Sequence, residues 1–169
     1  MRVAGALIAV LTGACGGAEP VYRDLPVIVD GTPEPPYQVG PPEVVPGHFE
    51  AEAFRPLADD EGLHIVRGLQ GGRWIHLAIR MRGVPRRAGR LTVEVHTPPR
   101  GETPLVQNTQ EVRPSPADGW LEVRQTQLHV PASDEEVADL DGQPGHLRVR
   151  YEAEGAQAEA TLSLVLVDG

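Results

Sequence analysis

From residue 47 onward, apolar and polar residues alternate in short runs that are separated by turn residues. Alternation with a period of two is typical of strands that bury one face. Residues 89–96 show it most clearly, because Leu91, Val93 and Val95 share one face. The same pattern predicts further strands at 48–54, 63–67, 74–81, 119–130, 146–153 and 158–167. The alternation therefore predicts about seven strands.

The longest of these strands changes its inward face partway along. Its apolar positions are Leu121 and Val123 in the first half, and Leu128 and Val130 in the second. The two pairs are an odd number of residues apart, so they cannot share one face of a regular strand. A β-bulge, which adds one residue to a strand, produces such a switch, and we expect it near Gln125.

The only helical signal is short. Ser133 and Glu136 have the spacing of a capping box, in which each side chain satisfies the other's end of the first turn. The apolar residues that follow end at Leu140, before Asp141 and Gly142. We therefore expect one or two helical turns near 134–140.

Strands with regular turns, in a core region of residues 47–169, predict an all-β fold. We expect a single antiparallel β-sandwich, and a small open barrel is the alternative topology. The run Asp139-Leu-Asp-Gly-Gln-Pro-Gly, a strand carrying Tyr151 and a hairpin to the final strand together resemble the end of an immunoglobulin-like domain. This resemblance implies an immunoglobulin-like architecture and no particular activity.

The amino terminus has the pattern of a secretory signal over residues 1–14. Arg2 supplies a positive charge, Val3–Leu11 has no polar side chain, and small residues lead to Cys15. The apolar run is well short of the roughly 20 residues that a membrane-spanning helix needs. We therefore expect a cleaved signal peptide.

The run Leu11-Thr12-Gly13-Ala14-Cys15 resembles the lipobox of bacterial lipoprotein signals. Gly13 and Ala14 match the two small positions, whereas Thr12 stands where the family has an aliphatic residue. The resemblance implies cleavage after Ala14, a diacylglycerol thioether on Cys15 and acylation of the new amino terminus. Gly16, in place of aspartate, implies sorting to the outer membrane. Several acyl chains would anchor the protein stably in a membrane.

Residues 15–46 are predicted to form a tether that carries the lipid attachment at its start. Eight prolines lie between Gly16 and Pro46, and proline disfavours both helices and central strands. We expect a disordered, partly extended polyproline spacer. Val21–Val29 is richer in apolar residues, and its packing against the folded domain is an alternative for that part.

Net charge and cysteine content limit the classes of partner and of chemistry that we expect. The formal net charge is −9, which argues against nucleic acid as a partner. Cys15 is the only cysteine, so its lipidation would leave no thiol for disulfides, metals or catalysis. We expect no cofactor.

The remaining candidate chemistry is sparse. The serines Ser115, Ser133 and Ser163 lie outside any nucleophile motif, and no pair of histidines has the spacing of a known metal motif. Solvated strand histidines are the simpler interpretation, but sheet pairing could bring some of them together. If a metal binds, the candidates are His64, His76 and His96, because each lies opposite the inward-facing residues of its strand.

These observations predict a lipid-anchored protein of the cell envelope, located at the outer membrane on its periplasmic or its surface face. Its β-sandwich would act by binding an envelope or extracellular ligand, or as a structural part, and not as an enzyme. The alternative is a periplasmic copper- or zinc-binding module that uses strand histidines.

Overall fold

The computed structural model describes residues 40–69 and 71–169. The predicted signal peptide, the lipid attachment at Cys15 and most of the tether lie outside these residues. The elements are β1 (Glu43–Glu50), β2 (Ala53–Pro56), β3 (Glu61–Arg67), β4 (Arg73–Arg82), β5 (Gly89–His96), β6 (Val106–Val112), β7 (Ser115–Ala117), β8 (Trp120–Val130), α1 (Asp134–Leu140), β9 (Pro144–Ala153) and β10 (Ala156–Asp168), with a 3-10 turn at Pro98–Arg100.

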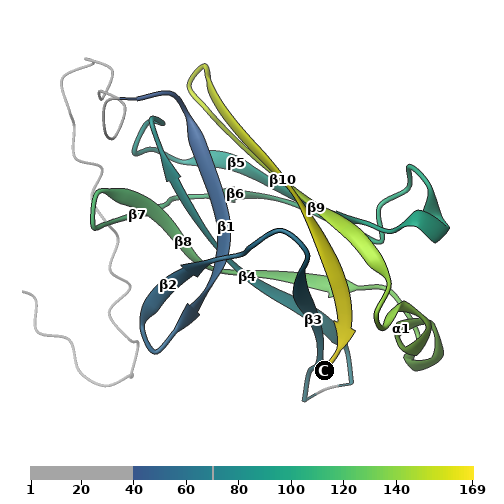
Figure 1. The fold of residues 1–169 in the computed structure, drawn as a ribbon. Coiled ribbons are helices and arrows are strands. Elements are labelled where there is room, and N and C mark those ends of the chain that lie inside the picture. The colour runs from purple at the N-terminus through teal and green to yellow at the C-terminus, as the bar shows by residue number, and fades with distance from the viewer. Residues whose placement is uncertain (1–39, 70) are drawn as a thin grey trace, which may run out of the picture. The chain divides into compact units, whose positions relative to one another are not determined.

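The ten strands form one curled, mixed sheet (Figure 1). The main path runs β2-β1-β4-β3-β10-β9-β5-β6, and β8 pairs with the other edge of β4 and carries β7. β3 links the two halves of the sheet, because it pairs with β4 in one half and with β10 in the other. The all-β prediction is confirmed. The expectation of a wholly antiparallel arrangement is wrong, because the β3–β10 pair is parallel.

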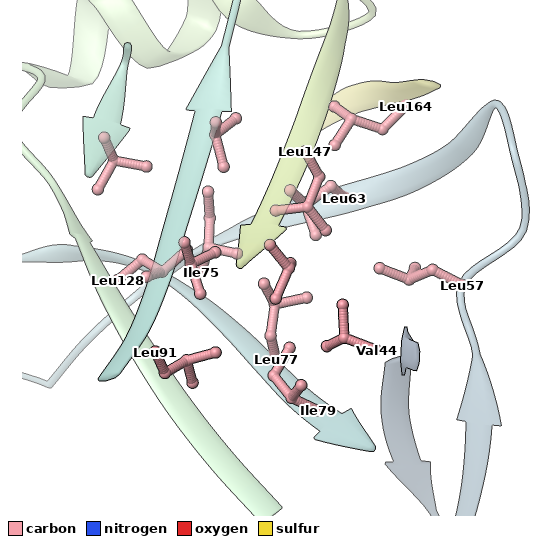
Figure 2. Packing of buried hydrophobic residues seen from close by; sticks show 14 of the residues in the cluster. Val44, Leu57, Leu63, Ile75, Leu77, Ile79, Leu91, Leu128, Leu147 and Leu164 are labelled. Atoms are coloured by element: carbon pink, nitrogen blue, oxygen red, sulfur yellow. The ribbon is translucent and has the colours of Figure 1, made fainter. Parts of the chain in front are cut away.

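The two halves of the curled sheet enclose one apolar core. Figure 2 shows Ile75, Leu77 and Ile79 of β4 projecting into the same interior as Leu91 of β5 and Leu147 of β9. All five side chains are almost completely buried. Burial of apolar surface on this scale supplies the main driving force for folding.

The best-defined strand predictions are confirmed. β5 spans residues 89–96, and the expected inward residues of β9, among them Val149 and Tyr151, are fully buried. Tyr151 also donates a hydrogen bond from its hydroxyl to the Arg87 carbonyl (3.0 Å), so its one polar atom is satisfied. Alternation therefore identified the core faces of the central strands correctly.

The predicted bulge is present in β8. Leu77 pairs with Thr126 and Ile79 pairs with Val123, so the two residues Arg124 and Gln125 face a single residue of β4. The extra residue restores an inward face to the second half of β8, where Leu128 and Val130 are buried.

The strand predicted at 48–54 is wrong, because the chain turns back on itself there. β1 and β2 form a hairpin whose two loop residues, Ala51 and Glu52, have φ angles of 46° and 68°. Positive φ at both loop residues is the geometry of a type I′ turn, which usually contains Asn and Gly. Ala-Glu lacks that signature, so the pattern gave no sign of a turn.

Two further strands lie where none was expected. β6 has no regular apolar alternation, and β7 is three residues long with Pro116 at its centre. The tether also ends earlier than the expected residue 46, because β1 begins at Glu43. The Pro46 carbonyl accepts a hydrogen bond from the Leu57 amide (3.0 Å). The nitrogen of a strand residue faces the same edge as its carbonyl, so Pro46 removes no donor from the ladder with β4.

The helix α1 begins with the predicted capping box. The Glu136 amide donates to the Ser133 hydroxyl (3.2 Å), and the Ser133 amide donates to the Glu136 carboxylate (2.7 Å). Val137 and Leu140 fix the helix to the core. Among the described residues, no helix has the length and apolar character needed to cross a membrane.

Candidate functional site

A fork in the sheet opens beside β4. One edge of β4 pairs with β1 over Glu43–Gly47 and with β3 at Val66–Arg67, while its other edge pairs with β8. Between these two contacts the ladder on the first edge is interrupted, because β1 leaves β4 at Gly47 to form its hairpin with β2 (Figure 1). A cavity lies in the fork, which we call the fork pocket.

Gly47 allows this departure of β1 from β4. A side chain at this position would come within 2.3 Å of the Arg55 carbonyl and 2.6 Å of the Phe54 ring. The close approach of β2 therefore requires the absence of a Cβ at residue 47. The fork therefore depends on a glycine at position 47.

The fork pocket has a volume of about 300 Å³, and six of its eight lining residues have polar or charged side chains. It brings together three imidazoles from three strands, two carboxylates and one guanidinium. These side chains are His48, His64, His76, Glu50, Glu61 and Arg55, with Gly62 and Val66 completing the wall.

His48 of β1 lines the fork pocket together with His76 of β4. Burial, and secondarily the charge of Arg55, lower the pKa of His48 below its ordinary value. The ring is therefore neutral at physiological pH, so it offers one hydrogen-bond donor and one acceptor.

Arg55 joins the two carboxylates of the pocket wall. Its Nε lies 2.6 Å from a Glu50 oxygen, and its Nη2 lies 2.5 Å from a Glu61 oxygen. The other oxygen of Glu61 accepts a hydrogen bond from the Ala58 amide (2.9 Å). The Arg55 hydrogen bond, followed by that of Ala58, lowers the pKa of Glu61 to about 2. Glu61 is therefore an anion at physiological pH, and its two oxygens are held by Arg55 and Ala58.

A second cavity of about 340 Å³ shares His48 and His76 with the fork pocket. Its wall includes the bulge of β8, where Arg124 lies over the Phe49 ring at 5.0 Å and within 3.6 Å of Glu52. Bulges often redirect side chains next to functional sites. The two cavities thus share His48 and His76 as part of their walls.

The structure separates the three histidines that the sequence suggested as metal ligands. His64 and His76 both line the fork pocket, but His96 lies on β5, where it stacks on His146 of β9 with ring centroids 4.6 Å apart. His48 is the third histidine that lines the fork pocket. Sequence reasoning missed it because the β1–β2 hairpin, which turns His48 toward β3, was not recognised.

No preformed metal centre exists in residues 40–69 and 71–169. Among them, no three His, Cys, Asp or Glu side chains are arranged to hold one metal ion. The fork pocket instead holds the Arg55 guanidinium and the Glu61 carboxylate in fixed positions by hydrogen bonds. Such an arrangement can bind a polar group through directed hydrogen bonds and charge.

The chain matches no protein-family model and no curated protein. A search of solved structures returned the crystal structure of an engineered protein, with 14% sequence identity and a TM-score of 0.33. The match covers 64% of this chain and 18% of the engineered protein. A similarity this low carries no argument about fold or function.

Proposed function

We propose that this protein is a lipid-anchored component of the cell envelope whose β domain binds a polar ligand without catalysing a reaction. The fork pocket is the observation that carries the binding role, because it joins a neutral imidazole, a fixed carboxylate and a guanidinium in one cavity. We further propose an immunoglobulin-like sandwich as the description of the fold. Its support is the single core shared by the two halves of the sheet.

The anchor rests on the run that ends in Cys15, together with the charged and apolar residues before it. A thioether-linked diacylglycerol with a further acyl chain gives stable attachment to a bilayer. The prolines between Gly16 and Pro42 would then space the domain from the membrane surface. The outer membrane is the proposed location because Gly16 follows the modified cysteine.

Acyl labelling of the native host tests the anchor. We expect the wild-type chain to incorporate labelled fatty acid and to enter the membrane fraction, and the Cys15→Ala chain to do neither. Protease treatment of intact cells distinguishes the surface from the periplasmic face. An unlabelled wild-type chain would overturn the lipoprotein assignment.

Site-directed photocrosslinking tests the fork pocket as the binding site. A photoreactive phenylalanine analogue at position 64 would lie at the pocket, whereas the same analogue at position 150 would lie on the outward-facing, half-buried side of β9. We expect a specific adduct in intact cells from position 64 alone, lost when Glu61→Gln and Arg55→Gln are added. Equal labelling from both positions, or no adduct from position 64, would contradict the proposal.

A copper- or zinc-binding role is the second candidate, favoured by the three imidazoles of the fork pocket. Neutral imidazole is the ligand form, and the pKa of His48 is lowered. A metal would require the side chains to rotate toward a common point, because they do not converge in this structure. Titration calorimetry with Zn²⁺ and Cu²⁺ tests this role. We expect a heat of binding with one metal ion per chain, which His64→Ala should abolish and His96→Ala should not. No heat with the wild-type chain would exclude this candidate.

A further inference from the structure

The strand β6 leaves one long edge of the sheet unpaired. It stands at the end of the strand order and pairs with β5. Within the part of the chain that the structure describes, no strand pairs with its other edge. Its seven residues, Val106–Val112, contain no proline and a single charge, Glu111. Such an edge is able to pair with another strand.

Two other edge strands of the sheet carry features that block such pairing. β2 has four residues and ends in Pro56, and β7 has three residues with Pro116 at its centre. Short strands and proline are the usual protections of sheet edges. β6 has neither protection. Its contact with β8 includes one hydrogen bond, from the Asn108 side chain to the Gln127 carbonyl (3.0 Å).

We propose that two copies of the protein associate by antiparallel pairing of their β6 edges around a two-fold axis at Thr109. A symmetric contact of this kind requires a self-complementary strand, because each residue meets its counterpart across the axis. With Thr109 opposite Thr109, Gln107 lies opposite Glu111, and Asn108 lies opposite Gln110. Val106 then lies opposite Val112.

Each of these pairs is chemically compatible. Gln107, Thr109 and Glu111 lie on the exposed face of β6, so an amide of one copy can donate to the carboxylate of the other. The half-buried Asn108 and Gln110 form an amide pair. No like charges face each other in this register. A shift of the register by one residue would place the exposed residues of one β6 opposite the half-buried residues of the other.

The proposed contact would continue an existing cross-strand pattern. On the exposed face, the Thr92 and Thr109 hydroxyls are 3.2 Å apart, and Gln107 donates to Glu94 (2.8 Å). The sheet would therefore extend from β5 through two β6 strands to β5 of the second copy. A contact of one strand is small, so we expect weak association with a dissociation constant of about 10–100 μM.

Sedimentation of the full chain carrying Cys15→Ala, which removes the lipidation site, tests this proposal. We expect a concentration-dependent dimer that Thr109→Lys weakens by roughly tenfold or more, because like charges would meet at the axis. Thr161→Lys is the matched control, since Thr161 is exposed on β10, away from the β6 edge. A wild-type monomer at about 200 μM, well above the expected dissociation constant, would overturn the proposal. An equal effect of the two lysines would also overturn it.

A mixing experiment keeps the test independent of the folding of any one variant. Thr109→Lys and Thr109→Glu should each be monomeric alone, and their mixture should form a heterodimer because opposite charges then meet at the axis. In the Cys15→Ala background, Thr109→Cys should form an intermolecular disulfide, since directly opposed strand residues have suitable Cα separations. A mixture that stays monomeric, or Thr109→Cys that does not crosslink, would refute the pairing at Thr109.

Discussion

At the residue scale, the outer face of β4 contains a buried ion pair. Glu122 has 2% of its side chain exposed and Arg80 has 19%, and the Arg80 Nε lies 2.7 Å from a Glu122 oxygen. The Arg80 guanidinium also lies 4.5 Å from the centre of the Phe54 ring, which shields the pair from water. A buried charge that loses its partner is costly, whereas an exposed pair is worth little.

We therefore expect Glu122→Ala to lower the free energy of unfolding by about 3–5 kcal/mol. Arg87→Ala is the control, because it breaks the exposed pair with Glu154 (2.8 Å) and should cost less than about 1 kcal/mol. Urea unfolding measures both changes. Similar losses in the two variants would show that burial does not determine the strength of the Arg80–Glu122 pair.

The lowered pKa of Glu61 in the fork pocket predicts that the stability of the folded chain depends on pH. Its pKa is lowered from 4.5 to about 2 in the folded chain, so the charged form is stabilised by folding. This contribution is complete above the unfolded pKa and is lost as the pH falls from about 4.5 to about 2. The urea midpoint should therefore fall over that range, and fall less in Glu61→Gln. Glu102→Gln, at an exposed loop position, should follow the wild type, and a Glu61→Gln profile identical to the wild type would disprove the assignment.

At the element scale, Arg73 ties three segments together. Its guanidinium donates to Asp134 at the start of α1 (2.9 Å) and to Asp168 at the end of β10 (3.2 Å), and its side chain is 10% exposed. Hydrogen bonds to charged groups are worth about 1.5–3 kcal/mol each when buried. The start of β4 thus fixes both the helix and the last strand.

Arg73→Met should cost about 2–3 kcal/mol and raise hydrogen exchange in α1 and the end of β10. Arg67→Met is the matched control, because Arg67 also donates to Asp134 (2.9 Å) but is well exposed. Exchange mass spectrometry should show little change for it. Unchanged exchange in α1 after Arg73→Met would mean that Val137 and Leu140 alone hold the helix.

The packing of each element against the core explains how much of the fold could be predicted from the sequence. β4, β5 and β9 alternate regularly because one face of each packs on the core. The bulge at Arg124 and Gln125 could be predicted because it shifts the alternation of apolar residues within β8. The edge strand β6 has no such constraint, so its polar residues carried no signal. The fork pocket depends on the turn at Ala51 and Glu52, and therefore only part of its histidine set could be inferred.

At the scale of the whole described domain, β3 and β10 determine whether the sheet behaves as one unit. Their parallel pairing joins a strand near the start of the domain to the last one, and Leu166 of β10 is fully buried opposite Leu63. β3 also pairs with β4, so the contact links both halves of the sheet. Loss of the β3–β10 contact should therefore weaken strands far from the substitution.

We expect Leu166→Ala to cost about 2–5 kcal/mol, because the cavity it leaves lies where the two halves meet. Hydrogen exchange should then rise together in β4 and β9, since opening this contact exposes the core to both. Val167→Ala, one residue along and only partly buried, should cost less and change exchange only near β10. Faster exchange confined to β10 in Leu166→Ala would show that the two halves unfold separately. The parallel pair would then be a local attachment, and the cooperativity of the domain would have to come from the packing of β4 against β5 and β9.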